Sequence, residues 1–205
     1  MKNAICLLFP YPLMLCGQIY EFSQAERQYL DELEMMDNTG NFMSKNDRVL
    51  DSEELAGLKA FIEQQLVTFT KDFLQMKDDN EIYITQSWTN KAKTNEFHPR
   101  HRHPNSVISG VMYLDDNQDE SLPPIRFHRT LEMFPMEFEY KSLNESNASC
   151  RAFPAVQGQL LLFPSLLEHD VEKNESDRVR TSISFNTFVR GKVGHDRKLT
   201  AVDIA

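Results

Sequence analysis

Apolar residues between about positions 23 and 77 recur every three or four residues, which is the pattern of amphipathic helices. Ser23 and Glu26 have the spacing of a capping box, in which each side chain bonds the backbone N–H of the other residue. This pair predicts a helix over about residues 24–36. Its buried side would carry Tyr29, Leu30 and Leu33.

A second helix is predicted further along the chain, where Asp51 and Glu54 repeat the capping-box spacing. The helical spacing of apolar residues continues to about Met76, and a run of polar residues follows it. The positions that share its apolar face are Leu55, Leu58, Phe61, Ile62, Leu66, Phe69 and Phe73. We interpret this stripe as part of the hydrophobic core rather than as a cofactor site.

The pattern changes from Glu81 onward, where short runs with a period of two predict β-strands. The runs are EIYITQSW, SVISGVMYL, PPIRFH, EFEY, GQLLLF, HDV and RTSISFNTFV. Short strands between polar turns indicate a sandwich or a barrel. Prolines interrupt residues 115–157, and we expect this segment to cover the mouth of the barrel and to contact the substrate.

A length of 205 residues is sufficient for one domain with a substantial core. The formal net charge of −9 and the lack of a basic run argue against nucleic acid as a partner. No run of about 18 apolar residues occurs, so no membrane-spanning helix is expected. The apolar N-terminal segment contains two prolines, and we interpret it as an edge strand followed by a second, proline-broken segment.

The three cysteines, Cys6, Cys16 and Cys150, have no paired spacing and lie mostly in apolar surroundings. We expect free thiols in a reducing compartment, which predicts a cytoplasmic protein.

The histidines form the most informative cluster, because His98, His101 and His103 all lie in the run HPRHRHPNSVISGVMYL. His101 and His103 are two residues apart, so their side chains leave an extended backbone on the same face. Imidazole is a ligand for Fe, Zn, Cu and Ni, and two neutral rings on one face can share a cation. A His-x-His pair on a surface loop can equally bind nothing, so the pair alone does not decide for a metal.

A second stretch, residues 158–188, adds a lone histidine and an arginine to this picture. His169 follows an apolar strand that Gly158 opens and Pro164 closes, and Arg180 begins the alternating run RTSISFN. One face of that run carries Arg180, Ser182, Ser184 and Asn186. A face with this chemistry should line a wet cavity or face solvent, because a dry core would leave the guanidinium unpaired.

Taken together, these stretches resemble the Fe(II)- and 2-oxoglutarate-dependent oxygenases, in particular a phage and bacterial branch of that superfamily. The resemblance covers about residues 5–195 and is carried by QSWTN, HRHPNSVISGVMYL, GQLLLFPSLLEHDV and RTSISFN. It implies a mainly β fold, a double-stranded β-helix (jelly roll) with flanking helices. Residues 1–205 would form one domain, with a helical buttress over about 23–77 and a β core over about 81–190.

The resemblance also implies roles for individual residues. His101 and His169 would bind Fe(II), Arg180 would pair with the distal carboxylate of the co-substrate 2-oxoglutarate, and Ser182 would hydrogen-bond the same carboxylate. If Ser109 and Tyr113 face the lumen, Tyr113 could also bond the co-substrate, and we include Ser109 with it among the cofactor-binding candidates. The chain departs from the superfamily at His103, where Asp or Glu is usual. Either three imidazoles bind the metal, or water occupies the position of the carboxylate.

The implied function is an Fe(II)/2-oxoglutarate dioxygenase of hydroxylase type, which uses O2 and acts on a small molecule or a peptide. It would work in the cytoplasm, or in the host cytoplasm if a phage encodes it. Two alternatives stay open. One is another metal-dependent β-barrel enzyme, such as a three-histidine dioxygenase or a zinc isomerase, and the other is a metal-free jelly-roll binding module.

The remaining aromatic candidates have weaker signals. His98 lies three residues before His101, and we expect it beside the metal ligands or on the substrate side. We interpret His128 as an ordinary strand or loop histidine. His195 lies in a polar tail that we expect to be exposed. Trp88, the only tryptophan, is expected to pack in the core.

Overall fold

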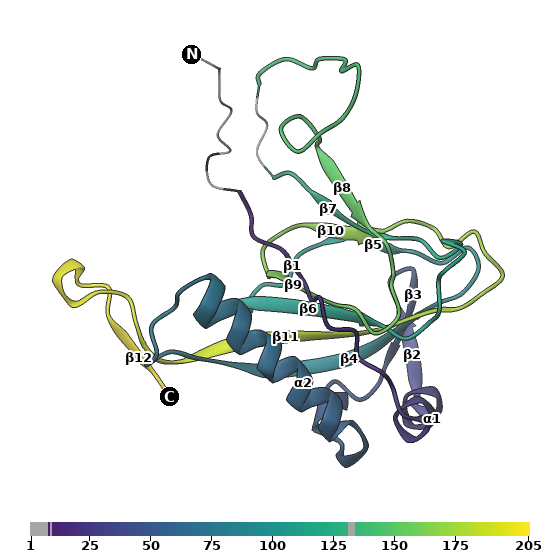
Figure 1. Ribbon diagram of the computed structural model, residues 1–205, viewed down its shortest axis with the longest axis horizontal. Helices are drawn as coiled ribbons and strands as arrows, with labels where there is room; N and C mark the ends of the chain where they lie inside the picture. Colours follow the sequence, from purple (N-terminus) through teal and green to yellow (C-terminus); the bar gives the residue numbers. More distant parts are fainter. Residues whose placement is uncertain (1–7, 9, 131–133) are drawn as a thin grey trace.

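The computed structural model describes residue 8, residues 10–130 and residues 134–205. Two antiparallel sheets face each other in a jelly roll, and the helices cover the outer face of the larger sheet (Figure 1). The prediction of a mainly β fold with flanking helices is therefore confirmed.

The two sheets are built from strands that lie far apart in the sequence. The larger sheet consists, in spatial order, of β1 (Met14–Leu15), β9 (Leu160–Pro164), β6 (Ile108–Tyr113), β11 (Arg180–Val193), β4 (Glu81–Ala92), β3 (Asn41–Ser44) and β2 (Met35–Asn38), with β12 (Val202–Ile204) paired to the C-terminal end of β11. The smaller sheet consists of β5 (His98–His101), β10 (His169–Val171), β7 (Ile125–His128) and β8 (Cys150–Phe153). Alternate residues of each strand point between the sheets, which is where the site lies.

The helical part precedes most of the strands. It comprises α1 (Gln24–Glu32), the 3₁₀ turns η1 (Val49–Asp51) and η2 (Glu53–Leu55), α2 (Ala56–Val67) and the π-helical turn η3 (Thr68–Phe73), while a further 3₁₀ turn, η4 (Asp196–Lys198), lies near the C-terminus. Figure 1 shows α2 lying along the outer face of the larger sheet.

Helix α1 has the predicted capping box, in which the Glu26 N–H donates to Ser23 Oγ at 3.2 Å and the Ser23 N–H donates to Glu26 Oε2 at 2.7 Å. Its predicted end near residue 36 is wrong, because the helix stops at Glu32 and Leu33 is extended. Met35 and Met36 instead belong to β2, where they pair with β3. Pairing with β3, which lies outside the predicted helix, therefore determines that the backbone at Met35 and Met36 is extended.

The predicted start of the second helix at Asp51 is also wrong. Ser52 is extended, with φ −74° and ψ 148°, and it separates two 3₁₀ turns. The α-helix begins only after Leu55, which provides no side-chain cap.

The second helix also changes its geometry at its C-terminal end. Residues Thr68–Phe73 form a π-helical turn, which contains more residues per turn than an α-helix. The turn rotates Phe73 out of the predicted stripe, so this side chain is exposed and stacks on Phe69 at 6.0 Å between ring centroids. The expectation that Phe73 is buried is therefore wrong.

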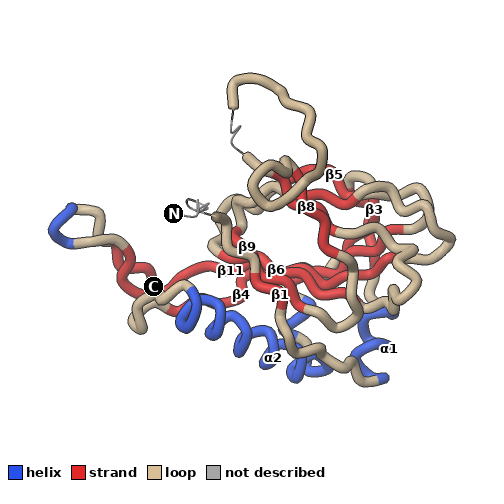
Figure 2. Tube along the Cα trace, turned by 45° about the horizontal axis from the view of Figure 1, so that its top comes forward, coloured by secondary structure: helices blue, strands red, loops and turns tan. Residues whose placement is uncertain are grey.

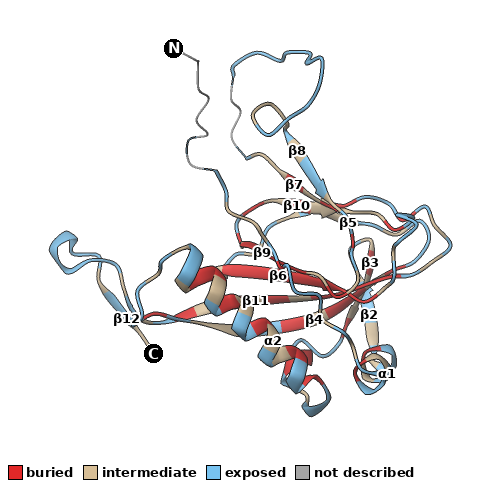
Figure 3. Cartoon of the chain, in the orientation of Figure 1, coloured by how far each residue is buried: buried red, intermediate tan, exposed pale blue. Residues whose placement is uncertain are grey.

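The rest of the predicted stripe forms the core between the helices and the larger sheet. Leu58, Ile62 and Leu66 are at most 1% exposed and pack against the outer face of that sheet. Each buried side chain of this kind stabilises the fold by about 1.5–3 kcal/mol. The packing is close at Gly110, where an added Cβ would lie 2.2 Å from Phe185 Cζ, so only glycine fits there. Figure 3 shows the buried central strands β4, β6 and β11.

Several strand predictions need correction. Residues 137–140 (EFEY) lie in a loop, and residues 134–149 extend away from the body of the molecule between β7 and β8 (Figure 2). Strands β2, β3, β8 and β12 were not predicted. The predicted N-terminal edge strand lies almost entirely outside the described residues, while β1, at the edge of the larger sheet, falls in the second, proline-broken segment.

Cys16 and Cys150 are free thiols, and Cys6 lies outside the described part of the chain. None of the helices in the described segments is long and apolar enough to span a membrane.

Candidate active site

Three histidines converge between the two sheets. Strands β5 and β10 are antiparallel neighbours, and His101 and His169 are directly paired across them. One ligand nitrogen from each of His101, His103 and His169 lies within 4.8 Å of the other two. Among the described residues, this is the only group of three or more potential metal-binding side chains that lie so close together.

His103 reaches this group from a loop and not from the strand. Strand β5 ends at His101, and the His103 N–H donates to the Ser165 carbonyl at 2.9 Å. Asn105 then adopts a left-handed conformation (φ 58°), which turns the chain back into β6. The prediction that His101 and His103 share one strand face is therefore wrong, although both rings do reach the same cluster.

Hydrogen bonds orient two of the three rings. His101 Nδ1 lies 2.8 Å from the Pro99 carbonyl, and His169 Nδ1 lies 2.9 Å from the Leu167 carbonyl. A carbonyl oxygen only accepts, so each Nδ1 carries the proton and each Nε2 keeps a free lone pair. In metal-binding histidines, this contact of the second nitrogen fixes the ring and its tautomer.

The distance between His103 Nε2 and His169 Nε2 is 3.2 Å. Metal–nitrogen bonds of about 2.1 Å that enclose an angle of roughly 90–100° place two nitrogens about 3.0–3.2 Å apart. The two rings are thus already spaced as neighbouring ligands of one cation.

Burial keeps the rings neutral. Burial, followed by the neighbouring His101 and His98, lowers the pKa of His103 to about 4. Burial together with the neighbouring His101 lowers the pKa of His169 to about 3. Burial also lowers the pKa of His101, while the bond to the Pro99 carbonyl acts in the opposite direction. Neutral imidazole is the form that binds metals, so no proton has to be displaced at neutral pH.

No carboxylate joins the three rings within the described structure. Asp170 follows His169 directly but faces the other side of the smaller sheet, where it accepts two hydrogen bonds of 2.8 Å from Arg126. His128 Nε2 lies 3.0 Å from Asp170 Oδ2 on that same side. His128 is therefore away from the three converging histidines, as an ordinary strand histidine would be.

The three histidines open into a pocket between the sheets. Its lining comprises Trp88, Asn90, His98, His101, His103, Gly110, Val111, Ile125, Phe163, His169, Val171, Arg180, Ser182 and Ser184. The alternation predicted for β11 is thus observed, because Arg180, Ser182 and Ser184 all reach this pocket.

Arg180 is 5% exposed and is held from two sides. Its Nε–H donates to the Pro123 carbonyl at 3.0 Å, and its guanidinium carbon lies 5.0 Å from the centre of the Tyr113 ring. Burial lowers the pKa of Arg180, but a guanidinium stays protonated in proteins. The Tyr113 hydroxyl is buried and has no hydrogen-bond partner within the described chain, and burial raises its pKa to about 12.

Two residues of β4 line the pocket without having been predicted to do so. The Trp88 ring lies 5.8 Å from the His103 ring, so the expectation that it packs in the core is wrong. Asn90 donates from Nδ2 to Ser184 Oγ at 3.1 Å, while its buried Oδ1 has no partner in the described residues. The period-two alternation of β4, which places Trp88 and Asn90 on one face, was the signal that could have identified them.

Ser109 does not reach the pocket lining, although we predicted it beside the co-substrate. Its hydroxyl lies 2.8 Å from Ser165 Oγ and donates to Asn186 Oδ1 at 2.9 Å. Ser165 Oγ also donates to Ser106 Oγ at 2.7 Å. This buried hydroxyl network joins the His103 loop to β6, β9 and β11, so Ser109 supports the position of His103 indirectly.

His98 lies beside the three converging histidines and stacks on His101 with 4.3 Å between ring centroids and 10° between ring planes. Burial, followed by the neighbouring His101, lowers its pKa to about 3. His195 is exposed, as its polar surroundings predicted.

Comparisons with known proteins bear on this site. The family model described as "Putative 2OG-Fe(II) oxygenase" matches residues 86–186, which include the three histidines and Arg180. A search of curated proteins found no match.

Several solved structures share the fold. HygX from Streptomyces hygroscopicus, solved with nickel, 2-oxoglutarate and hygromycin B, is 13% identical with a TM-score of 0.62, and the match covers 86% of this chain and 82% of HygX. A prolyl-4-hydroxylase from Pseudomonas putida is 15% identical (TM-score 0.56, 86% of this chain and 92% of that chain). A 2OG-Fe(II) oxygenase family oxidoreductase from Burkholderia pseudomallei is 13% identical (TM-score 0.56, 78% and 74%).

Proposed function

We propose that the pocket between the sheets binds Fe(II) and 2-oxoglutarate for an oxygenase reaction of hydroxylase type. The match of residues 86–186 to the model described as "Putative 2OG-Fe(II) oxygenase" supports this proposal. The observation that carries the proposal is the position of Arg180 in the same pocket as three converging, neutral imidazoles. The substrates are 2-oxoglutarate, O2 and a primary substrate that is a small molecule or a peptide.

His101, His103 and His169 would hold the metal. Fe(II) with its co-substrate and O2 supplies the oxidising chemistry, in which 2-oxoglutarate is decarboxylated to succinate and CO2 and one oxygen atom enters a C–H bond of the primary substrate. Three protein ligands leave positions free for a bidentate 2-oxoacid and for O2. The residues fit this role because their Nε2 atoms converge and their protons lie on the outward-facing nitrogens of His101 and His169.

Arg180 would bind the distal carboxylate of 2-oxoglutarate. Its Nε is occupied by the Pro123 carbonyl, and the two terminal nitrogens remain for the two oxygens of a carboxylate. Ser182 lines the pocket from the same strand and would donate a hydroxyl to this carboxylate. The unpartnered Tyr113 hydroxyl, close to the guanidinium, would donate a further hydrogen bond.

Three neutral imidazoles would give this site a more positive charge than the usual pair of histidines with one carboxylate. A ferrous ion then keeps its full charge of +2 instead of +1, and attraction to a dianionic 2-oxoacid increases in a partly dry pocket. We therefore expect tight binding of 2-oxoglutarate.

An anaerobic titration tests the proposed function directly. Addition of 2-oxoglutarate to the Fe(II)-loaded protein should produce the weak visible charge-transfer band of a 2-oxoacid bound to ferrous iron. Metal binding without the band would contradict the use of 2-oxoglutarate, and a protein that binds no metal would contradict the whole proposal.

A second candidate function follows from the absence of a carboxylate among the described residues that surround the metal position. Three-histidine metal sites also occur in β-barrel dioxygenases that oxidise thiols without a 2-oxoacid. Arg180 favours the first function, because a buried guanidinium in the pocket needs an anionic partner. Turnover that is independent of 2-oxoglutarate would favour the second.

We predict that Arg180→Ala raises the KM for 2-oxoglutarate by about 100-fold, since losing one partner of a buried charge pair costs about 2–5 kcal/mol. Arg180→Lys keeps the charge but loses the bidentate contact, and it should raise KM less. Consumption of 2-oxoglutarate gives KM, and metal titration without co-substrate serves as the control, because iron affinity should not change. An unaltered KM in Arg180→Ala would remove Arg180 from the co-substrate site.

A further inference from the structure

We call the pocket between the sheets, which contains the three histidines, the metal pocket. A second cavity of about 550 Å³ lies next to it, and His98 and Val171 line both cavities. Its lining comprises Phe97, His98, Pro99, Glu120, Ser121, Leu122, Pro123, Pro124, Arg126, Asp170, Val171, Glu172, Lys173 and Glu175. We call this cavity the entry groove. Its volume lies within the range of about 300–1,000 Å³ that is typical of small-molecule sites.

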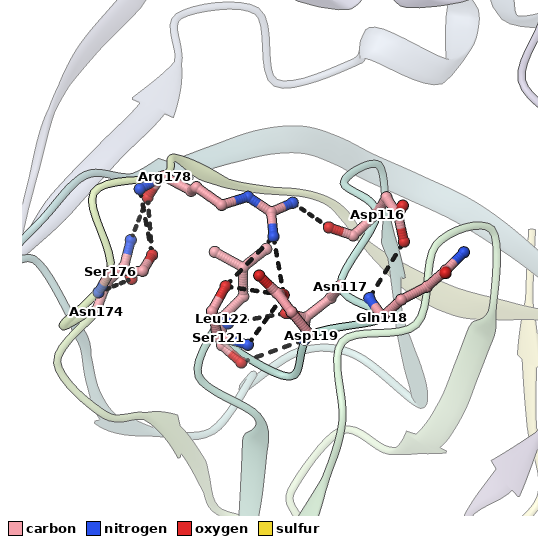
Figure 4. Close-up of polar contacts among 9 residues, drawn as sticks. All are labelled: Asp116, Asn117, Gln118, Asp119, Ser121, Leu122, Asn174, Ser176 and Arg178. Carbon is pink, nitrogen blue, oxygen red and sulfur yellow. Dashed lines mark hydrogen bonds and ion pairs between the residues drawn. The ribbon is translucent and has the colours of Figure 1, made fainter.

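Two loops that form walls of the entry groove are tied together by one arginine. Arg178 Nη1 donates to Asp119 Oδ1 at 3.0 Å and to Ser121 Oγ at 3.3 Å, and its Nη2 donates to the Asp116 carbonyl (Figure 4). The loop before β7 is thereby fixed to the loop before β11.

Each of the two loops also has internal support. Asn174 is fully buried, and its Nδ2 donates to the carbonyls of Ala92 (3.0 Å) and Arg178 (2.7 Å). In the opposite loop, Asn117 Oδ1 accepts the Leu122 N–H at 2.8 Å. The walls are therefore preorganised, which lowers the entropic cost of binding a ligand.

The charges of the entry groove are mostly negative. Its titratable lining contains Glu120, Asp170, Glu172 and Glu175 against Arg126 and Lys173. Arg126 bonds Asp170 and Glu172 and is already neutralised by them. Glu120 and Glu175, in contrast, have no ion-pair partner among the residues that the structure describes. Val171 and His98 line the end next to the metal pocket.

We propose that the entry groove binds the primary substrate, and that this substrate is a small molecule with a protonated amine beside an apolar part. The proposal rests on the proposed function, because the metal pocket gives the groove its reactive end. Phe97, Leu122 and Val171 would cover the apolar part, while the unpaired carboxylates of Glu120 and Glu175 attract the ammonium group. A C–H bond of the same molecule then faces the metal past His98.

Three probes of matched shape test the charge preference: 4-phenylbutylamine, 4-phenylbutan-1-ol and 4-phenylbutyrate. Calorimetry on the anaerobic protein loaded with Fe(II) and 2-oxoglutarate, at low ionic strength, should show the amine binding about tenfold more tightly than the alcohol, and the acid binding most weakly. In the double variant Glu120→Gln/Glu175→Gln the amine should lose about 3- to 10-fold in affinity and approach the alcohol, because exposed ion pairs contribute modestly.

The matched control is Glu53→Gln/Glu54→Gln, which changes the net charge by the same amount at two exposed residues of η2 outside the entry groove. Its amine affinity should equal that of the unaltered protein. The proposal is overturned if the amine binds no more tightly than the alcohol, if none of the probes binds, or if the control variant loses as much affinity as the groove variant.

A repeat of the titration without Fe(II) and 2-oxoglutarate separates this proposal from the proposed function. The preference for the amine should persist, since the carboxylates lie outside the metal pocket. Failure of the oxygenase assignment would therefore leave amine binding measurable. If the protein forms the charge-transfer band but shows no preference for the amine, the proposal for the entry groove is overturned and the proposed function stands.

Discussion

Replacement of His169 by alanine should abolish stoichiometric iron binding and 2-oxoglutarate turnover. His169 is 5% exposed and lies between His101, its cross-strand pair, and His103, whose Nε2 is 3.2 Å from its own. Loss of even an outer hydrogen-bond partner of a metal ligand lowers metal affinity about 10- to 100-fold. Loss of the central ligand should cost at least the upper end of that range.

Iron content after anaerobic reconstitution and 2-oxoglutarate consumption measure this effect. The fold should persist, because the helix-side core does not involve His169, and circular dichroism checks this. His195→Ala is the matched control, since it removes an exposed histidine and should keep full iron content. A His169→Ala protein with stoichiometric iron and normal 2-oxoglutarate consumption would refute the assignment.

The second large effect is expected at His103, which we propose takes the position that Asp or Glu usually has in the family that the chain resembles. His103→Ala should weaken iron affinity by a factor on the order of 10 to 100 or more, because it removes one ligand of three. His103→Asp should retain iron, since a carboxylate restores the usual ligand set. This variant should also bind 2-oxoglutarate less tightly than the unaltered protein, because the negative charge reduces the attraction of the site for a dianion.

Competition with a metal-sensitive dye gives the iron affinity of both variants, and the charge-transfer band gives their affinity for 2-oxoglutarate. An alternative geometry predicts a different result: if the His103 ring turns away and water takes its place, His103→Ala binds iron as the unaltered protein does. Equal affinities of these two proteins would exclude a three-histidine site.

The local signals that the sequence predicted correctly are those that depend on neighbouring residues. Ser23 and Glu26 form their capping box because both lie within one turn of the helix. Arg180 and Ser182 face one pocket because side chains alternate along a strand whatever the strand pairs with. The proposal of Fe(II) and 2-oxoglutarate chemistry also came from the sequence, by its resemblance to a family.

The tertiary structure alone decided the features that depend on remote partners. Met35 and Met36 form a strand because β3 pairs with them, and Phe73 is exposed because a π-helical turn rotates it away from the sheet. His103 joins His101 and His169 through a loop that the Ser165 carbonyl holds, and Ser165 is 62 residues away in the chain. The entry groove forms where Arg178 joins two loops that are far apart in the sequence, so it could not be predicted from a local sequence pattern. Periodicity determines which face a side chain takes, whereas contacts across the fold determine what that face meets.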